Sequence, residues 1–252
     1  RYKASSSGLE LAIFENVGIG TGFAANNPWL QENPDPITKA TWDNHANLSQ
    51  KTATELGVAQ GDVVKLDVKG KSVELPVIIQ PGLAQGTVAV AIGYGREKAG
   101  KSANGVGKNV FPFATFTDGF LNFTPGEVTL SKTGDTREIA QTQTHNTVMN
   151  RKSVLQETVL AHFQKDPMAG RFVPKIQTSE GEVDATDLSL WNGHKYKNHS
   201  WGMVIDLNTC FGCGSCVISC QNENNIPVVG RQEVINSREM HWLRIDRYYS
   251  SD

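Results

Sequence analysis

The 252-residue sequence contains no apolar run that approaches the roughly 18 residues needed to span a bilayer, so we expect any membrane association to come through a partner. It also has almost no net charge, with 24 basic residues against 26 acidic ones. This balance provides neither a basic stripe nor a polybasic patch, and nucleic acid is therefore not an expected partner. Cysteine is scarce, with four residues in the chain. Four cysteines are too few for a disulfide scaffold in a chain of this length.

The four cysteines nevertheless lie within eleven positions, in Cys210-Phe-Gly-Cys213-Gly-Ser-Cys216-Val-Ile-Ser-Cys220. This C-x2-C-x2-C-x3-C spacing is the one with which bacterial ferredoxins bind iron–sulfur clusters. The two glycines between the first three cysteines allow tight turns, because glycine adopts positive φ without a Cβ clash. We expect Cys220 on a short helix that begins near Cys216, pointing away from the first cluster, since the last cysteine of this spacing binds the other cluster in two-cluster ferredoxins.

Two other interpretations of the cysteines stay open. A structural zinc site usually has two separate C-x2-C pairs, or cysteine pairs with distant histidines, whereas the pairs here share Cys213. Disulfides between such near neighbours would close almost no loop. His199 and His241 flank the segment, so each could lie near a cluster or a quinone site, although a lone histidine is more often a surface or core residue.

The first part of the chain predicts short strands separated by turns, which is typical of a small β-barrel or sandwich. Lys69-Gly70 and Pro81-Gly82 are the turn signals, and Gly57 is expected to end one or two helical turns that begin at Thr52. The expected strands cover residues 9–17, 63–68, 73–79 and 87–92, with a further β-region over 110–143.

The second part predicts less regular structure. A capping-box pattern at Ser153 predicts a helix to about Phe163, and residues 164–198 are expected to be a polar linker. Strands are expected over residues 201–207 and 241–249. Because the sequence begins at Arg1 without Met and stops soon after a predicted strand, we expect a fragment of a longer polypeptide.

Residues 95–102, Gly-Arg-Glu-Lys-Ala-Gly-Lys-Ser, match the P-loop pattern G-x4-G-K-[ST]. A working P-loop must continue directly into a helix that meets the phosphates. The following Ala-Asn-Gly-Val-Gly-Lys-Asn opposes a helix, so we interpret the match as accidental and the segment as a surface loop.

Residues 201–227, from Trp-Gly-Met-Val-Ile-Asp-Leu-Asn-Thr-Cys210 to Cys220-Gln-Asn-Glu-Asn-Asn-Ile-Pro, resemble the opening of four-cluster ferredoxin subunits. These subunits accompany molybdopterin oxidoreductases of the dimethyl-sulfoxide-reductase and polysulfide-reductase type. The resemblance implies that Cys210, Cys213 and Cys216 bind one cluster with a ligand from a later motif, and that Cys220 serves a different cluster. It implies [4Fe-4S] clusters and leaves [3Fe-4S] open as an additional type.

Residues 38–145 resemble the C-terminal domain of the molybdopterin enzymes themselves. The resemblance lies in Ala53-Thr-Glu-Leu-Gly-Val-Ala-Gln-Gly-Asp-Val-Val, in Pro81-Gly82 with Gly86, and in Ala91-Ile-Gly-Tyr-Gly. In that family the domain is a double-psi β-barrel that helps to hold the dinucleotide ends of the pterin cofactor.

Both parts on one chain, together with Asn26-Asn-Pro-Trp-Leu-Gln-Glu-Asn-Pro-Asp and Thr41-Trp-Asp-Asn, resemble the iron–sulfur subunit of bacterial alternative complex III. The expected fold is mainly β: a barrel domain over residues 1–150, a helix and linker over 151–198, and the start of a ferredoxin-like α+β domain over 199–252.

That resemblance implies electron transfer in a respiratory complex that oxidises quinol, with a vestigial barrel that holds no molybdopterin. The implied partners are a membrane-embedded quinone-binding subunit, c-type cytochrome subunits, a terminal oxidase and the rest of the polypeptide, at the periplasmic face of the inner membrane. No catalytic residue is evident in the sequence. The alternatives are the electron-transfer part of an active molybdopterin oxidoreductase and a non-redox scaffold with a zinc knuckle.

Overall fold

The computed structural model describes residues 8–191 and 193–250, so the first seven and last two residues of the expected domains lie outside it. The chain divides into two compact units. We call residues 1–144 with 209–247 the barrel unit, and residues 145–208 with 248–252 the linker unit. The cysteine-rich residues 210–220 thus belong to the same compact unit as the barrel, a grouping that the expected boundaries at residues 150 and 198 do not include.

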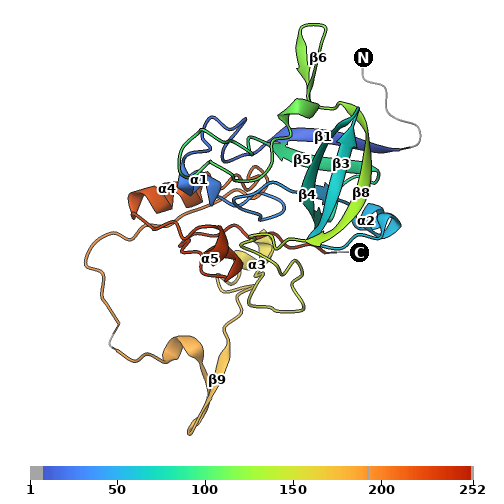
Figure 1. The fold of residues 1–252 in the computed structure, drawn as a ribbon. Helices are drawn as coiled ribbons and strands as arrows, with labels where there is room; N and C mark the ends of the chain where they lie inside the picture. Colours follow the sequence, from blue (N-terminus) through green and yellow to red (C-terminus); the bar gives the residue numbers. More distant parts are fainter. Residues whose placement is uncertain (1–7, 192, 251–252) are drawn as a thin grey trace. The chain divides into compact units, whose positions relative to one another are not determined.

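Six strands of the barrel unit form a closed barrel in the order β1-β5-β2-β4-β3-β8 (Figure 1). β1 pairs with β5, and β2 with β4, in parallel, while the other neighbours are antiparallel. The strands are β1 (Leu9–Glu15), β2 (Ala46–Leu48), β3 (Asp62–Val68), β4 (Lys71–Ile79), β5 (Thr87–Ile92) and β8 (Gly126–Thr136). The prediction of a mainly β fold is confirmed.

Alternating burial along the strands forms the core of the barrel. In β3, Val64, Leu66 and Val68 are buried and the residues between them are more exposed, because successive side chains point to opposite faces of a strand. Burying each such side chain contributes about 1.5–3 kcal/mol. Lys69 and Gly70 both have positive φ, at 52° and 79°, which are the signs required by the tight turn that joins β3 to β4.

The helix α2 (Gln50–Leu56) begins two residues earlier than the expected Thr52. The Ser49 side chain accepts a hydrogen bond from the Thr52 N–H and caps the first turn. Gly57, with φ of 65°, ends the helix in the left-handed conformation, as the sequence predicts.

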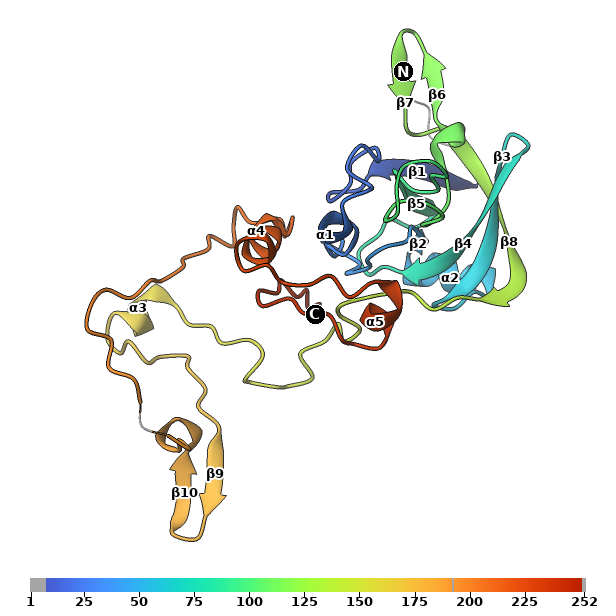
Figure 2. The ribbon, with the colours of Figure 1, turned by 60° about the vertical axis from the view of Figure 1, so that its left-hand side comes forward.

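Shorter elements surround the barrel (Figure 2). The single turn α1 (Pro28–Gln31) begins after the Asn27 cap and contacts α4. A small hairpin of strands, one 3-10 turn and two α-helices are the remaining elements among the described residues of the unit. These are η1 (Phe111–Phe113), β6 (Thr115–Thr117), β7 (Phe120–Asn122), α4 (Ser215–Glu223) and α5 (Arg231–Ile235).

In the linker unit, the prediction of a helix from Ser153 to about Phe163 is wrong for most of its length. Only its end is helical, where α3 (Leu160–Phe163) forms one turn. Gln156, which a capping box would direct back to Ser153, instead accepts a hydrogen bond from the Phe172 N–H at 3.0 Å. The expected linker over residues 164–198 contains a hairpin of β9 (Lys175–Thr178) and β10 (Gly181–Asp184), followed by η2 (Ala185–Asp187).

The two strands expected near the cysteines are also absent from the described residues. Residues 201–206 form no regular secondary structure and Leu207 begins a turn, and Trp201 is fully exposed. Within the expected strand 241–249, the Gln143 side chain forms hydrogen bonds with both backbone groups of Arg247. It donates to the Arg247 carbonyl at 2.8 Å and accepts from the Arg247 N–H at 2.7 Å. A side-chain amide therefore occupies the place of a neighbouring strand.

Candidate metal centre

The cysteines lie on a turn that runs directly into a helix. Gly212 and Gly214 both have left-handed backbones, with φ of 79° and 80°, as the tight turns between the first three cysteines require. Gly214 precedes the first residue of α4, which carries Cys216 and Cys220 one turn apart. The prediction of a short helix beginning near Cys216 is confirmed.

The four thiols form no disulfide among the described residues, so all are available as ligands. Cys213 Sγ is hydrogen-bonded to Ser215 Oγ at 3.2 Å. This hydroxyl, together with the Ser215 N–H, holds the pKa of the Cys213 thiol below its usual value. The lowered pKa favours the thiolate, which is the form that binds metals. At the other end of the set, Asn224 Nδ2 donates to Cys220 Sγ at 3.6 Å.

The donor set of the turn consists of four cysteine side chains that form no disulfide among the residues described. Thiolates are the soft ligands that both iron–sulfur clusters and zinc accept. Within the described part of the chain, however, no three His, Cys, Asp or Glu side chains come close enough to hold one metal ion. The cluster and the zinc site therefore both stay open as interpretations of these cysteines.

Apolar residues around the cysteines differ in their surroundings. Phe211 is 68% exposed, and Ile218 is half-buried. Val217 is buried and faces a small cavity that Gly212, Gly214 and His241 also line. Val217 is thus a packing residue beneath the turn.

His241, one of the two flanking histidines, lies beside this turn. Burial lowers the pKa of its imidazole, and Nε2 has no hydrogen-bond partner among the residues that the structure describes. His199 belongs to the linker unit and is exposed. His241 therefore belongs to the surroundings of the cysteine turn within the barrel unit.

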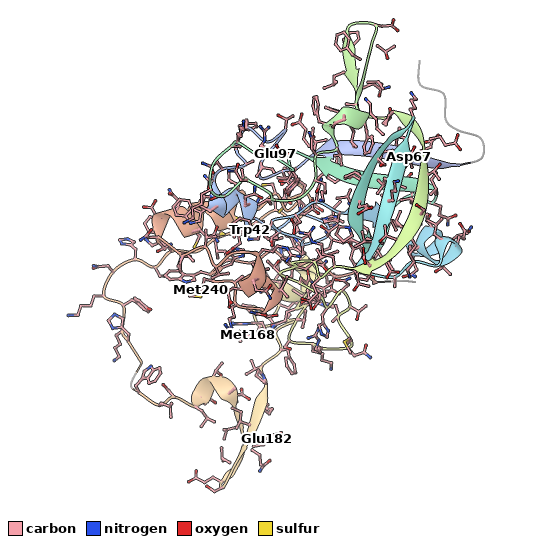
Figure 3. The ribbon with its side chains drawn as sticks, in the orientation of Figure 1. Trp42, Asp67, Glu97, Met168, Glu182 and Met240 are labelled. Carbon is pink, nitrogen blue, oxygen red and sulfur yellow. The ribbon has the colours of Figure 1, made fainter. Side chains whose placement is uncertain are left out.

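The far end of the cysteine segment is fixed by residues of the loop around α1. Trp29 Nε1 donates to the Ile226 carbonyl at 3.2 Å. The fully buried Glu32 accepts from the N–H groups of Val229 and Gly230, at 3.1 and 2.8 Å, and from Trp42, labelled in Figure 3. The contacts to Ile226, Val229 and Gly230 join residues nearly 200 positions apart, and no local pattern in the sequence predicts them.

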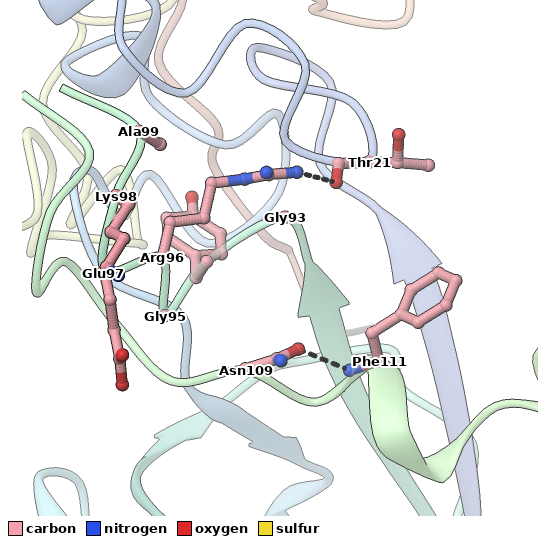
Figure 4. A pocket seen from close by; sticks show the side chains of 10 residues that line it. Thr21, Gly93, Gly95, Arg96, Glu97, Lys98, Ala99, Asn109 and Phe111 are labelled. Carbon is pink, nitrogen blue, oxygen red and sulfur yellow. Dashed lines mark hydrogen bonds between the residues drawn. The ribbon is translucent and has the colours of Figure 1, made fainter.

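The P-loop-like segment forms an open pocket of about 530 Å³ (Figure 4). The chain folds back on itself here, since the Gly105 N–H donates to the Arg96 carbonyl at 2.9 Å and the Gly95 N–H to Val106. The Arg96 guanidinium is bonded to the Thr21 carbonyl at 3.1 Å, and no residue from 93 to 110 is helical. This loop lacks the helix N-terminus that a nucleotide-binding P-loop uses, as the sequence predicts.

No protein-family profile matches the chain. Over 26 residues, 10% of the chain, it is 69% identical to the "Menaquinone reductase, iron-sulfur cluster-binding subunit" of Nitratidesulfovibrio vulgaris (strain Hildenborough) and spans 10% of that protein. Over 25 residues it is 52% identical to the "Arsenate respiratory reductase iron-sulfur subunit ArrB" of Chrysiogenes arsenatis, of which it spans 83%.

Among solved structures, "Acetylene Hydratase from Pelobacter acetylenicus" aligns with 49% of this chain and 18% of its own, at 17% identity and a TM-score of 0.38. A similarity of this size carries no argument about function. No helix in the described part of the chain is both long and apolar enough to cross a membrane.

Proposed function

We propose that residues 210–220 bind iron–sulfur clusters that carry electrons within an oxidoreductase complex. The reason is that, over one short stretch, the chain belongs to the iron–sulfur subunits of respiratory reductases. The observation that supports this most directly is the cysteine spacing on a double glycine turn, with a thiol of lowered pKa at Cys213. When bound, such clusters accept and release one electron at a time.

The residues of this chain hold and tune the clusters rather than make or break substrate bonds. Cys210, Cys213 and Cys216 bind one cluster, and Cys220 supplies a ligand to another, with the remaining ligands outside these 252 residues. Ser215, which lies 3.2 Å from Cys213 Sγ through its hydroxyl, lowers the pKa of the Cys213 thiol and so favours the thiolate. [4Fe-4S] is the expected cluster type, with [3Fe-4S] a further type for a site that has three cysteines.

The finer proposal is a subunit like that of alternative complex III. Quinol would be oxidised in a membrane-embedded partner at the periplasmic face, and electrons would pass through the clusters to c-type cytochromes or a terminal oxidase. The six-stranded barrel would be a vestigial double-psi barrel without molybdopterin, followed by the linker and a ferredoxin-like domain. The near-neutral charge and the absence of a basic stripe agree with protein partners rather than nucleic acid.

Iron and acid-labile sulfide analysis of the full-length protein, with EPR of the reduced sample, tests the cluster assignment. Cys213→Ala and Cys220→Ala are expected to disturb different EPR signals, whereas Ser219→Ala, an exposed position on the same helix, should disturb neither. Loss of the same single signal in both cysteine variants would refute the division of ligands. A preparation with zinc and no iron would favour the zinc-knuckle scaffold.

Metal analysis also separates the two redox functions. A stoichiometric content of molybdenum or tungsten would favour an active molybdopterin oxidoreductase of the polysulfide or dimethyl-sulfoxide type. Clusters that are reduced by quinol in the isolated membrane complex, without either metal, would support the quinol-oxidising function.

A further inference from the structure

We infer that Asn33, which precedes the first cysteine by nearly 180 residues, is a positioning residue that orients the Cys213–Gly214 peptide of the cluster turn. The inference rests on the proposed function, because it concerns the cluster that Cys213 would bind. It assigns the loop after α1 to the cluster site and gives the barrel unit a role in electron transfer.

The Asn33 side chain lies directly against this peptide. Asn33 is 7% exposed, and its Nδ2 donates to the Cys213 carbonyl at 3.3 Å. A Cβ added at Gly214 would lie 2.3 Å from Asn33 Oδ1, so no larger residue fits between the two without a shift. Gly214 is therefore required both for its φ of 80° and for the close approach of Asn33.

The hydrogen bond to Cys213 fixes more than one carbonyl group. In a planar trans peptide, the C=O of Cys213 and the N–H of Gly214 point in opposite directions. A carbonyl held by Asn33 therefore sets the direction of the Gly214 N–H. Hydrogen bonds from N–H groups to the sulfurs of a cluster are a principal means by which proteins set its reduction potential.

The same loop also contacts the other end of the segment, which provides a matched control. Trp29 Nε1 bonds to the Ile226 carbonyl at 3.2 Å, beyond the C-terminal end of α4. A Trp29→Phe substitution removes that bond and leaves the Asn33 contact with Cys213 in place. If Asn33 only fastened the segment to the barrel, the two substitutions would have similar effects on the cluster.

The experiment compares wild type, Asn33→Leu and Trp29→Phe in the full-length protein with its clusters. Iron and sulfide content, EPR spectra and potentiometric titration are measured for each. We expect Asn33→Leu to shift the reduction potential of the cluster bound by Cys213 to more negative values. Without the bond from Asn33, the orientation of the Cys213–Gly214 peptide is no longer fixed, and the Gly214 N–H donates less well to sulfur. The signal that depends on Cys220 should not move, and Trp29→Phe should leave both potentials unchanged.

An unchanged potential in a normally loaded Asn33→Leu protein would overturn the inference, and so would an equal shift in Trp29→Phe. If the Asn33→Leu protein does not bind its clusters, Asn33→Ser is measured in its place. The serine hydroxyl is too short to reach the Cys213 carbonyl, yet it keeps the site polar. That variant must show the same negative shift, and an unshifted potential would refute the role of Asn33. A wild-type protein without iron and sulfide would refute the proposed function itself, and can be distinguished from both outcomes.

Discussion

Asp43 and Arg231 are 188 positions apart in the sequence, yet their side chains form an ion pair in the barrel unit. The Asp43 carboxylate is only 8% exposed and also accepts from Arg137 Nη2 at 3.0 Å and from the Gly107 N–H at 2.9 Å. Arg231 is the first residue of α5. The pair thus fixes the helix that follows the cysteine segment to the loop that precedes β2.

We predict that Asp43→Asn lowers the free energy of unfolding by about 1.5–3 kcal/mol, the usual value of a hydrogen bond to a charged group. Urea unfolding followed by tryptophan fluorescence measures the loss. The control is Arg238→Ala, which breaks a pair with Glu233 whose arginine is 70% exposed, and which should cost less than about 1 kcal/mol. Equal losses in the two variants would contradict the importance given to the buried pair.

Glu32→Ala should destabilise the protein by about 3 kcal/mol, because each buried donor left without an acceptor costs about 1–3 kcal/mol. Glu32 accepts from Trp42 Nε1 and from the N–H groups of Val229 and Gly230. Glu32→Gln retains one acceptor oxygen and should lose less. Urea unfolding gives the free energies, and limited proteolysis near residue 230 reports local release. An alanine variant as stable as wild type would contradict this account.

We predict that burial of the His45 side chain makes the protein less stable in acid. Burial is the main cause that lowers the pKa of its imidazole, although Asp35 and Asp43 oppose the shift. Because the unfolded chain takes up the proton near pH 6.5 and the folded chain only at lower pH, stability is full above that pH. It decreases as the pH falls from there towards the lowered folded pKa.

The difference between wild type and His45→Gln isolates this contribution, since clusters and other groups are common to both. Unfolding free energies at several values between pH 5 and pH 8, on either side of the ordinary histidine pKa, should give a shallower pH dependence for the variant. His241, whose pKa burial also lowers, accounts for part of the slope that remains. Parallel curves for the two proteins would show that His45 titrates normally.

Gly95→Ala should be strongly destabilising, by more than about 2 kcal/mol, because overpacking adds to the strain of a positive φ. Its φ is 73°, and an added Cβ would lie 2.1 Å from the backbone nitrogen of Asn109. Gly105→Ala, in the same loop, has a φ of 72° but meets nothing within 4 Å. It should cost only about 1–2 kcal/mol from the backbone strain. The melting temperatures of the two variants distinguish the effect of the close contact at Gly95 from that of backbone strain alone. Similar melting temperatures for Gly95→Ala and Gly105→Ala would contradict the expected clash.

Local signals predicted the barrel part well. The alternation in residues 63–68, the Lys69-Gly70 turn and the Gly57 cap depend on neighbouring residues alone, and all three appear in the structure. The expected strands over 201–207 and 241–249 failed for a common reason, since a strand needs a partner and alternation alone does not supply one. The capping box at Ser153 failed because Gln156 bonds to Phe172 instead.

The sequence by itself determined the four candidate ligands, Cys210, Cys213, Cys216 and Cys220, together with the glycine turn and the helix that carry them. These follow from the spacing of residues and from backbone preferences within a dozen positions. Only the tertiary structure decided that Asn33 lies against Cys213, since this contact joins residues 180 positions apart. No local propensity encodes such a contact, because it depends on how the folded chain brings the loop around α1 against residues 213–214.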